Sequence, residues 1–365
     1  MVKSAFLREL RNLFFFAVVA SSRSSIRFAS ATFTTWYVEV SGNATTNCSQ
    51  ANRPCGSIQT AINLASENDT ILLGPGTFIE YVCVNKTNIT LAGAVTSPPT
   101  TIIQSAVLQN HKAAGNDIIL DIFGWNVTIQ DIAILHPNGT ALQRDIGIIV
   151  RKTAHNTTLQ RVRVERQRTG TVLEPTNPGS RGLLVYSATG TVCVDSTFTG
   201  NYQDHVYIPA SHSNITRNTI QGATRLGISL PNNTNMIALN NTIVGNIITD
   251  SGIDGIQVEG DFNSIISNQI SSSGAYGIHI CGNSFVPGNV QCEPPGLNAT
   301  AEGNLVEQNL VNDNSLGGIL DQGENNTLLQ NYVNQYTSTS QAGSLTGMLA
   351  HALITGGYFA WNLLN

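Results

Sequence analysis

A repeat of about 22 residues constrains this chain more than any other feature. Between residues 206 and 270, three cassettes share one spacing: two aliphatic residues nine positions apart, then an asparagine three positions later. The cassettes are Val206–Ile215–Asn218, Ile228–Ile237–Asn240 and Ile256–Ile265–Asn268. The polar column continues at Ser196, Asn309 and Asn331, and its successive members are 22, 22, 28, 41 and 22 residues apart. A period that holds constant apart from a few longer members predicts a solenoid of stacked coils.

The contents of each period predict short β-strands that must stack to bury their apolar face. Alternations such as Gly-Ile-Ser-Leu at 227–230, Gly-Ile-Gln-Val at 255–258 and Gly-Ile-His-Ile at 277–280 are apolar on one side only. Gly, Asn, Ser and Asp between them favour turns, because they tolerate positive φ or hydrogen-bond their own backbone. An asparagine at one phase of every coil can bond to the asparagines of neighbouring coils as a ladder. We therefore predict an all-β, single-stranded parallel β-helix.

Two runs give this prediction a family. Asn263-Ser-Ile265-Ile-Ser-Asn268-Gln-Ile270 and Asn326-Thr-Leu328-Leu-Gln-Asn331-Tyr-Val333 follow one pattern. With the Gly-Ile-x-Ile strands, they resemble the right-handed β-helix proteins of the pectin-lyase-like superfamily, and the resemblance extends from about Tyr37 onward. It implies a right-handed coil. It also implies a choice among polysaccharide lyases, glycosidases, uronate epimerases, phage tailspikes and adhesins.

The two ends of the chain differ from the repeat. Residues 1–33 place Lys3, Arg8 and Arg11 before an apolar run and then small residues, as a secretory signal peptide does; the Ser/Arg-rich continuation leaves an organelle transit peptide open. The β-helix is predicted over residues 34–342. Helical spacing at 58–65 predicts an amphipathic helix that caps its first coil. Residues 343–365 are predicted to be a terminal cap or an apolar tail, with a lipid-anchor signal as the alternative.

Composition and cysteines bear on location and partners. Only 11% of residues are charged and the net charge is −5, which argues against nucleic acid as a partner. The apolar run near the N-terminus is too short to span a bilayer, so no membrane span is predicted in the mature chain. Cys48 with Cys55, and Cys281 with Cys292, bracket short loops and predict two local disulfides in an oxidising compartment. Cys83 and Cys193 lie in apolar strand patterns and are predicted to be buried thiols. Many Asn-x-Ser/Thr sequons favour a secreted glycoprotein.

The phase of the repeat predicts which side chains share the outer face of one sheet. If Val206, Ile228, Ile256 and Ile278 point inward, their successors Tyr207, Ser229, Gln257 and His279 form an outward column. A parallel column follows two residues later, and polar groups precede the strands. These further residues are Pro209, Pro231, Glu259 and Cys281 in the second column, and Asp204, His205, Arg225, Asp254 and Tyr276 before the strands. Acidic, basic, imidazole and phenol groups would therefore gather over adjacent coils.

We assign these groups provisional roles. Asp204, His205, Tyr207, Arg225 and His279 are the candidate catalytic residues, since proton abstraction beside a uronate carboxylate needs a base, a proton donor and a cation. Gln257, Glu259 and Asp254 would bind substrate. Asp250 and Asp261, with Asp254 and Glu259, offer the hard oxygen ligands of a Ca²⁺ site, with no cofactor as the alternative. Asp, Asn, Gly and Ser in such turns also serve backbone geometry alone. The stretch Tyr202-Gln203-Asp204-His205 resembles the Tyr…Asp-Pro-His stretch of alginate epimerases, with the proline absent.

The predicted function is action on an acidic polysaccharide by β-elimination or uronate epimerisation, with glycoside hydrolysis as a weaker candidate. The alternative is a non-catalytic protein that binds glycans or mediates adhesion. The scarcity of Lys and Arg on the candidate face favours that alternative. Assembly as a homotrimer stays open, because many β-helix proteins form trimers.

Overall fold

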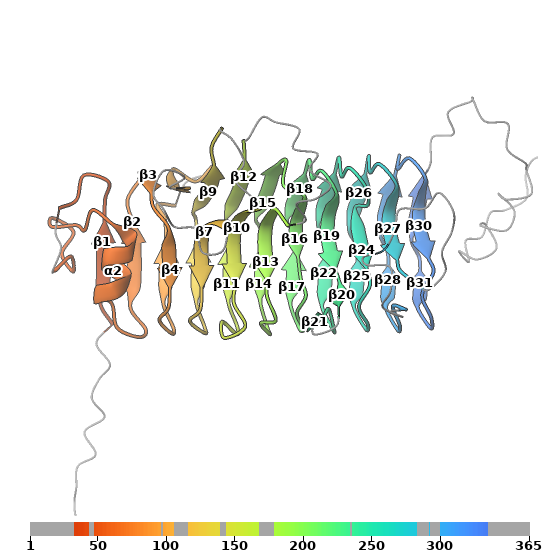
Figure 1. Cartoon of the computed structure of the whole chain (residues 1–365), viewed down its shortest axis with the longest axis horizontal. Helices are drawn as coiled ribbons and strands as arrows, with labels where there is room; N and C mark the ends of the chain where they lie inside the picture. Colours follow the sequence, from red (N-terminus) through yellow and green to blue (C-terminus); the bar gives the residue numbers. More distant parts are fainter. Residues whose placement is uncertain are drawn as a thin grey trace, which may run out of the picture. The chain divides into compact units, whose positions relative to one another are not determined.

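The computed structural model describes residues 33–334, apart from residues 44–46, 96–97, 106–115, 139–143, 168–178, 234–235, 283–291 and 293–299. Over these residues the chain winds into successive coils, and strands one coil apart pair in parallel (Figure 1). The pairing forms three sheets, here named A, B and C, so the predicted parallel β-helix is confirmed. No helix among the described residues is long and apolar enough to cross a membrane.

The strand bounds follow the winding. Sheet A contains β1 (Thr35–Val38), β2 (Thr70–Leu73), β5 (Thr90–Ala92), β8 (Thr128–Gln130), β11 (Thr158–Gln160), β14 (Val192–Val194), β17 (Asn214–Thr216), β22 (Thr242–Val244), β25 (Ser264–Ile266), β28 (Leu305–Glu307) and β31 (Thr327–Leu329). Sheet B contains β3 (Gly76–Ile79), β6 (Thr101–Gln104), β9 (Ala133–His136), β12 (Arg163–Arg166), β15 (Thr197–Gly200), β18 (Thr219–Gln221), β23 (Ile247–Thr249), β26 (Gln269–Ser271), β29 (Leu310–Asn312) and β32 (Tyr332–Asn334). Sheet C contains β4 (Val82–Val84), β7 (Asn116–Ile122), β10 (Arg144–Val150), β13 (Arg181–Val185), β16 (Asp204–Tyr207), β19 (Leu226–Leu230), β24 (Ile256–Val258), β27 (Tyr276–Ile280) and β30 (Gly317–Asp321).

The core consists of aliphatic columns that run from coil to coil. In sheet C the register pairs Val206 with Ile228, Ile228 with Ile256, and Ile256 with Ile278, and all four are fully buried. This is the inward phase that the sequence predicts. Each such side chain stabilises the fold by about 1.5–3 kcal/mol relative to an exposed one. The repeat therefore encodes the fold directly.

Two asparagine ladders run through the later coils, where the sequence predicted one. The first joins Asn218, Asn246, Asn268, Asn309 and Asn331 through side-chain amides. The second joins Asn241, Asn263, Asn304 and Asn326 in the same way. Each amide also donates to a carbonyl of the coil below, for example from Asn268 Nδ2 to Ile243 O at 2.9 Å. Each rung thus fixes a turn to the preceding coil.

The cassette Ile228–Ile237–Asn240 was wrong in its last two members. The short antiparallel hairpin β20 (Asn232–Asn233) and β21 (Met236–Ile237) interrupts this coil between sheets C and A. Ile237 is therefore 46% exposed, and Ile243 takes the inward position opposite Ile215. Asn246 therefore follows Asn218 by 28 residues instead of the 22 of the base period, and the six extra residues belong to this insertion. Because they restore a spacing of nine by coincidence, the sequence period alone misplaced the insertion.

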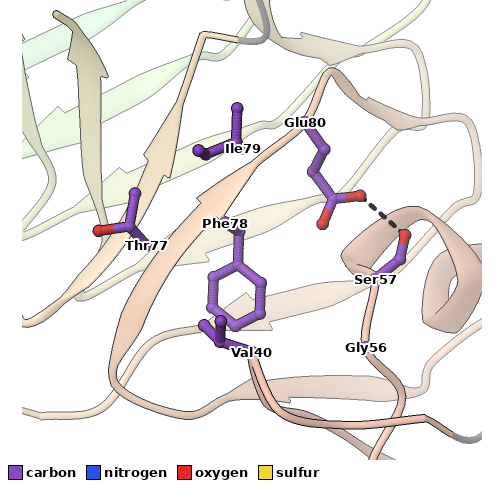
Figure 2. Close-up of a pocket in the computed structure, with 7 residues that line it drawn as sticks. All are labelled: Val40, Gly56, Ser57, Thr77, Phe78, Ile79 and Glu80. Atoms are coloured by element: carbon purple, nitrogen blue, oxygen red, sulfur yellow. Dashed lines mark hydrogen bonds between the residues drawn. The ribbon is translucent and has the colours of Figure 1, made fainter.

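The predicted helix at the start of the β-helix is α2 (Ile58–Leu64). Its Ile58, Ala61 and Ile62 are buried in the core. Ser57 caps its N-terminus, and the Glu80 carboxylate accepts bonds from Ser57 Oγ and Ile58 N, both at 2.8 Å. Figure 2 shows Glu80 beside a pocket of about 220 Å³ that Phe78 also lines. The carboxylate beside this pocket is therefore engaged in capping the helix.

Both predicted disulfides are present, Cys48–Cys55 and Cys281–Cys292. Cys193 is a buried thiol as predicted, but Cys83 is half-buried. The prediction for Cys83 was wrong because Val82 and Val84 point inward, which leaves Cys83 on the outer face of sheet C. The signal-peptide and tail segments, residues 1–33 and 343–365, lie outside the described residues except for Phe33, and their assignments stay predictions.

Candidate active site

The outer face of sheet C carries the predicted polar groups in two outward columns. Tyr207, Ser229, Gln257 and His279 are paired in register, one per coil. Closer to the turn from sheet B, Asp204 pairs with Arg181 of the preceding coil and with Leu226 of the next. The strands β13, β16, β19, β24 and β27 that hold these columns are neighbours in Figure 1. Because the coils stack in register, residues more than 70 positions apart share one face.

A cationic cluster occupies the centre of this face, around Asp204. Arg225 makes a bidentate ion pair with Asp204, from Nε to Oδ1 at 2.8 Å and from Nη2 to Oδ2 at 2.7 Å. Arg181 approaches the same carboxylate, with Nη2 at 3.4 Å from Oδ2, and its guanidinium lies 3.7 Å from the centroid of the Tyr207 ring. Asp204 is fully buried, while the side chains of Arg181 and Arg225 are 11% and 14% exposed. Among the described residues, two guanidinium groups thus approach one carboxylate.

Arg181 is the residue that the sequence analysis missed. It follows the segment 168–178 that interrupts the repeat, and the cassettes were traced only from residue 206 onward. A signal was present: Arg181-Gly182-Leu183 has the phase of Asp204-His205-Val206, and the register pairs Arg181 with Asp204. Arg181 weakens the objection that only one cation is available to neutralise a uronate.

His205 does not join this cluster. It occupies a position that is glycine in the adjacent coils, Gly182 and Gly227, at the corner where sheets B and C meet. Its ring is fully buried, with Nε2 2.8 Å from the carbonyl oxygen of Gln221 and the ring edge against Tyr202. Burial lowers the pKa of His205 to about 4 despite the hydrogen bond from the ring to Gln221 O. This imidazole is neutral at physiological pH and faces the interior.

A second group surrounds His279, on the third coil after that of Asp204. Its Nδ1 lies 3.1 Å from Asp254 Oδ2, and its Nε2 lies 3.1 Å from Gln322 Oε1. Both His279 and Asp254 are fully buried, and Asp254 also accepts from the backbone N of Tyr276 and from Gln257 Nε2. Burial alone would lower the pKa of His279, but the hydrogen bond and charge of Asp254 outweigh it and raise that pKa. The site is built to hold an imidazolium between two acceptors.

The Cys281–Cys292 disulfide lies beside this second group. Cys292 Sγ lies 3.6 Å from His279 Nε2, on the side of the ring opposite Asp254. Cys281 follows directly after β27, which carries His279. As arranged here, His279 cannot contact a polymer on the face of sheet C. Its geometry fits a positioning group better than a proton donor to substrate.

The structure does not bring the proposed metal ligands together. Asp250 lies in the turn before β24, where its Oδ2 accepts from Gln221, whereas Asp261 lies in the turn after β24, where its Oδ1 accepts from Glu302 N. Glu259 is 3% exposed and accepts from the backbone N of Asn232. Among the described residues, no group of three side chains that could hold an ion includes Asp250, Asp254, Glu259 or Asp261. A role in the backbone geometry of the turns therefore explains the positions of Asp250 and Asp261 better than a Ca²⁺ site does.

One further polar cluster, unforeseen from the sequence, lies at the corner of sheets B and C in earlier coils. His136 Nδ1 is 2.7 Å from Tyr202 Oη, and its Nε2 is 3.8 Å from Asp117 Oδ2. Asp145 nearby accepts from Arg166 Nε at 2.7 Å. Asp117, His136 and Asp145 lie within metal-binding distance of one another. The Arg166 guanidinium already supplies positive charge to Asp145, so an additional cation would be disfavoured there.

A family model of the right-handed beta helix region matches residues 147–333, just over half of the chain. The chain belongs to this family. Two similar solved structures are the Dettilon tailspike protein, 15% identical with a TM-score of 0.53, and the enzymatically active domain of tailspike protein 2 from bacteriophage CBA120, 11% identical with a TM-score of 0.57. The matches cover 77% and 85% of this chain but only 51% and 44% of theirs, so the chain spans about half the length of these right-handed β-helix proteins.

Pectate lyase Pel9A is a third similar structure, 14% identical with a TM-score of 0.49. The match covers 86% of this chain and 82% of the lyase chain. At such identities the likeness to solved structures shows the fold alone. No curated protein sequence matches the chain significantly. The activity must therefore be argued from the residues on the face of sheet C.

Proposed function

We propose that this right-handed β-helix protein acts on an acidic polysaccharide at the outer face of sheet C, by β-elimination or uronate epimerisation. The observation that carries the proposal is the pair of guanidinium groups, Arg181 and Arg225, on the single buried carboxylate of Asp204. Both reactions remove a proton next to a uronate carboxylate, and that step is slow unless a cation neutralises the carboxylate. Arg181 and Arg225 are the proposed source of that cation.

Tyr207 is the proposed proton-transfer group. Its ring stacks on Arg181, and its residue is 9% exposed. Asp204 orients the two arginines, and Gln257 lies two coils along in the same column as Tyr207. His205 and His279, both fully buried, are left out of the chemical step.

The alternative is a protein that only binds glycans, and one observation favours it. Each charged group of the central cluster is already paired within the protein, so substrate would have to loosen existing ion pairs. A binding protein needs no such rearrangement.

The inferred location is the same for the enzyme and for the glycan-binding protein. The two disulfides support an oxidising, extracellular compartment, and we propose secretion and glycosylation on that basis.

The test is absorbance near the unsaturated-uronate band, with alginate, polygalacturonate and glycosaminoglycans as substrates, with and without Ca²⁺. Proton NMR of the same mixtures detects epimerisation. We expect Arg225→Gln and Tyr207→Phe each to lower kcat/KM by about 10²–10³-fold. Arg217→Gln and Tyr332→Phe are matched controls, because Arg217 makes the same bidentate bond to Asp195 on an exposed turn and Tyr332 is 63% exposed on β32.

Three outcomes separate the hypotheses. Turnover lost in the site variants but kept in the controls supports the enzyme. Binding without turnover or epimerisation on any polymer supports the glycan-binding alternative. Turnover that survives both site variants, with thermal melting unchanged, would contradict the assigned roles.

A further inference from the structure

Positive charge is confined to one part of this chain. No lysine or arginine follows Arg225, whereas ten aspartates and glutamates do. The coils that follow β19 are therefore acidic, and the cations of the described residues lie in the earlier coils. Residues 34–225 carry 13 lysines and arginines against 12 aspartates and glutamates, so a polyanion laid along the coil axis would be repelled by the later coils but not by the earlier ones.

The earlier coils carry an exposed row of aromatic and cationic groups where sheet C turns toward sheet A. Phe123, Arg151 and Tyr186 each follow directly after a strand of sheet C, β7, β10 and β13. They share one phase, because Arg151 N donates to Ile122 O and Tyr186 N donates to Val150 O. Phe123 and Tyr186 are 40% and 42% exposed, and the Arg151 side chain is 30% exposed. Lys152, next to Arg151, is exposed as well.

This row is held in place from below. Arg151 makes a bidentate bond to Asp121, at 2.7 and 2.8 Å, and Asp121 also accepts from Tyr81 Oη at 3.0 Å. The Arg151 guanidinium lies 5.3 Å from the centroid of the Phe123 ring. A ring and a guanidinium that are already oriented lose little conformational entropy when a ligand binds.

We infer that Phe123, Arg151, Lys152 and Tyr186 form a binding platform for the anionic polysaccharide, separate from the cluster at Asp204. Exposed aromatic rings offer an apolar face to the C–H face of a sugar ring, and the adjacent cations attract its carboxylate. Successive coils lie about 4.8 Å apart, so three coils offer about 10 Å of surface along the coil axis. Tyr207 lies on the next coil after Tyr186, opposite Leu184, so the platform continues toward the proposed reaction centre.

The direction of binding follows from the same charges. From Tyr207, the polymer extends over β13, β10 and β7 toward the N-terminal coils. In the other direction it would lie over the part of the chain after Arg225, which carries ten aspartates and glutamates and no lysine or arginine. The platform rests on the proposed function for its ligand, but its contribution is to affinity for polymer and not to the proton transfer.

Binding to an immobilised polyuronate, with carboxyl-reduced polymer as the uncharged comparison, tests the platform. The protein carries Tyr207→Phe throughout, so that turnover cannot degrade the ligand. We expect Tyr186→Ala, Phe123→Ala and Lys152→Ala each to weaken polyuronate binding by about tenfold relative to that background. Phe262→Ala, at a residue 54% exposed among the acidic coils, and Tyr332→Ala are the matched controls and should change nothing.

The outcomes distinguish the platform from the reaction centre. Equal binding by platform and control variants overturns the platform, and turnover by the unsubstituted chain then still decides the proposed function. Tight binding of the carboxyl-reduced polymer overturns the charge argument. If the unsubstituted chain neither binds nor turns over any polyuronate, both proposals fail.

Discussion

The first asparagine ladder gives a prediction whose size can be worked from the structure. Asn268 is fully buried, and its side chain takes part in four hydrogen bonds. Its Nδ2 donates to Ile243 O and Asn309 Oδ1, and its Oδ1 accepts from the backbone N and the Nδ2 of Asn246, all within 2.9–3.0 Å. Asn268→Ala removes all four without opening the site to water.

The losses are unequal. The Nδ2 of Asn246 keeps Ile215 O, and Asn309 Oδ1 keeps the backbone N of Asn268. The backbone N–H of Asn246 loses its acceptor, and a buried donor without a partner costs about 1–3 kcal/mol. Three further bonds at about 0.5–1.5 kcal/mol each bring the expected loss in the free energy of unfolding to about 2.5–7.5 kcal/mol.

Urea denaturation of Asn268→Ala measures this loss, and amide hydrogen exchange locates it. Asn334→Ala, at an exposed position on β32, is the matched control and should cost less than about 0.5 kcal/mol. The Asn246 amide should exchange faster in Asn268→Ala than in the unsubstituted chain. A loss below 1 kcal/mol, or an Asn246 amide that stays protected, would refute the reasoning that ladder bonds hold the coils together.

Three further predictions concern titration and reactivity. Burial lowers the pKa of His205 to about 4, so between pH 6.5 and 4 the unfolded chain binds a proton at this histidine and the folded chain does not. The free energy of unfolding should therefore fall by about 3 kcal/mol in total as the pH is lowered through this window. His205→Gln should reduce this dependence of stability on pH in urea denaturation. The pKa of His279 is raised, so its stabilising interaction is present below pH 6.5 and is lost as the pH rises through the raised pKa. Asp254→Asn should lower the pKa of His279 in an NMR titration. An unchanged pKa would contradict Asp254 as its partner. Alkylation of the native protein, read by mass spectrometry, should label Cys83 slowly and Cys193 only after unfolding, and rapid labelling of Cys193 would contradict its burial.

The inward half of this fold could be predicted from the sequence because its determinants repeat. Val206, Ile228, Ile256 and Ile278 were placed correctly, since each coil applies the same packing requirement to the same phase. The helix over 58–64 and the two disulfides were local patterns and were equally accessible. The error at Ile237 and Asn240 arose where a hairpin was inserted, because an insertion changes the count without changing the composition.

The site was harder to predict because it depends on differences between coils. His205 was grouped with Asp204 as its neighbour in sequence, yet adjacent residues at the corner of a coil point to different environments. Comparison of the coils would have shown the histidine at a glycine position, between Gly182 and Gly227. The burial of His279 depends on Cys292 and Gln322, which are contributed by a loop and a later coil, and no period links them to it.

Ion pairs between adjacent coils show why the cluster at Asp204 differs from its surroundings. Four other described pairs, Asp121–Arg151, Asp131–Arg161, Asp145–Arg166 and Asp195–Arg217, also place the arginine on the coil that follows its aspartate. In each of these pairs the ion pair joins two adjacent coils. Two arginines lie within 3.4 Å of Asp204, and Asp204 is fully buried, so water screens its charge less than it screens a surface pair. A stacking device that the chain uses repeatedly for cohesion has here gained a second cation, on the face of sheet C where we propose that a polyanion lies.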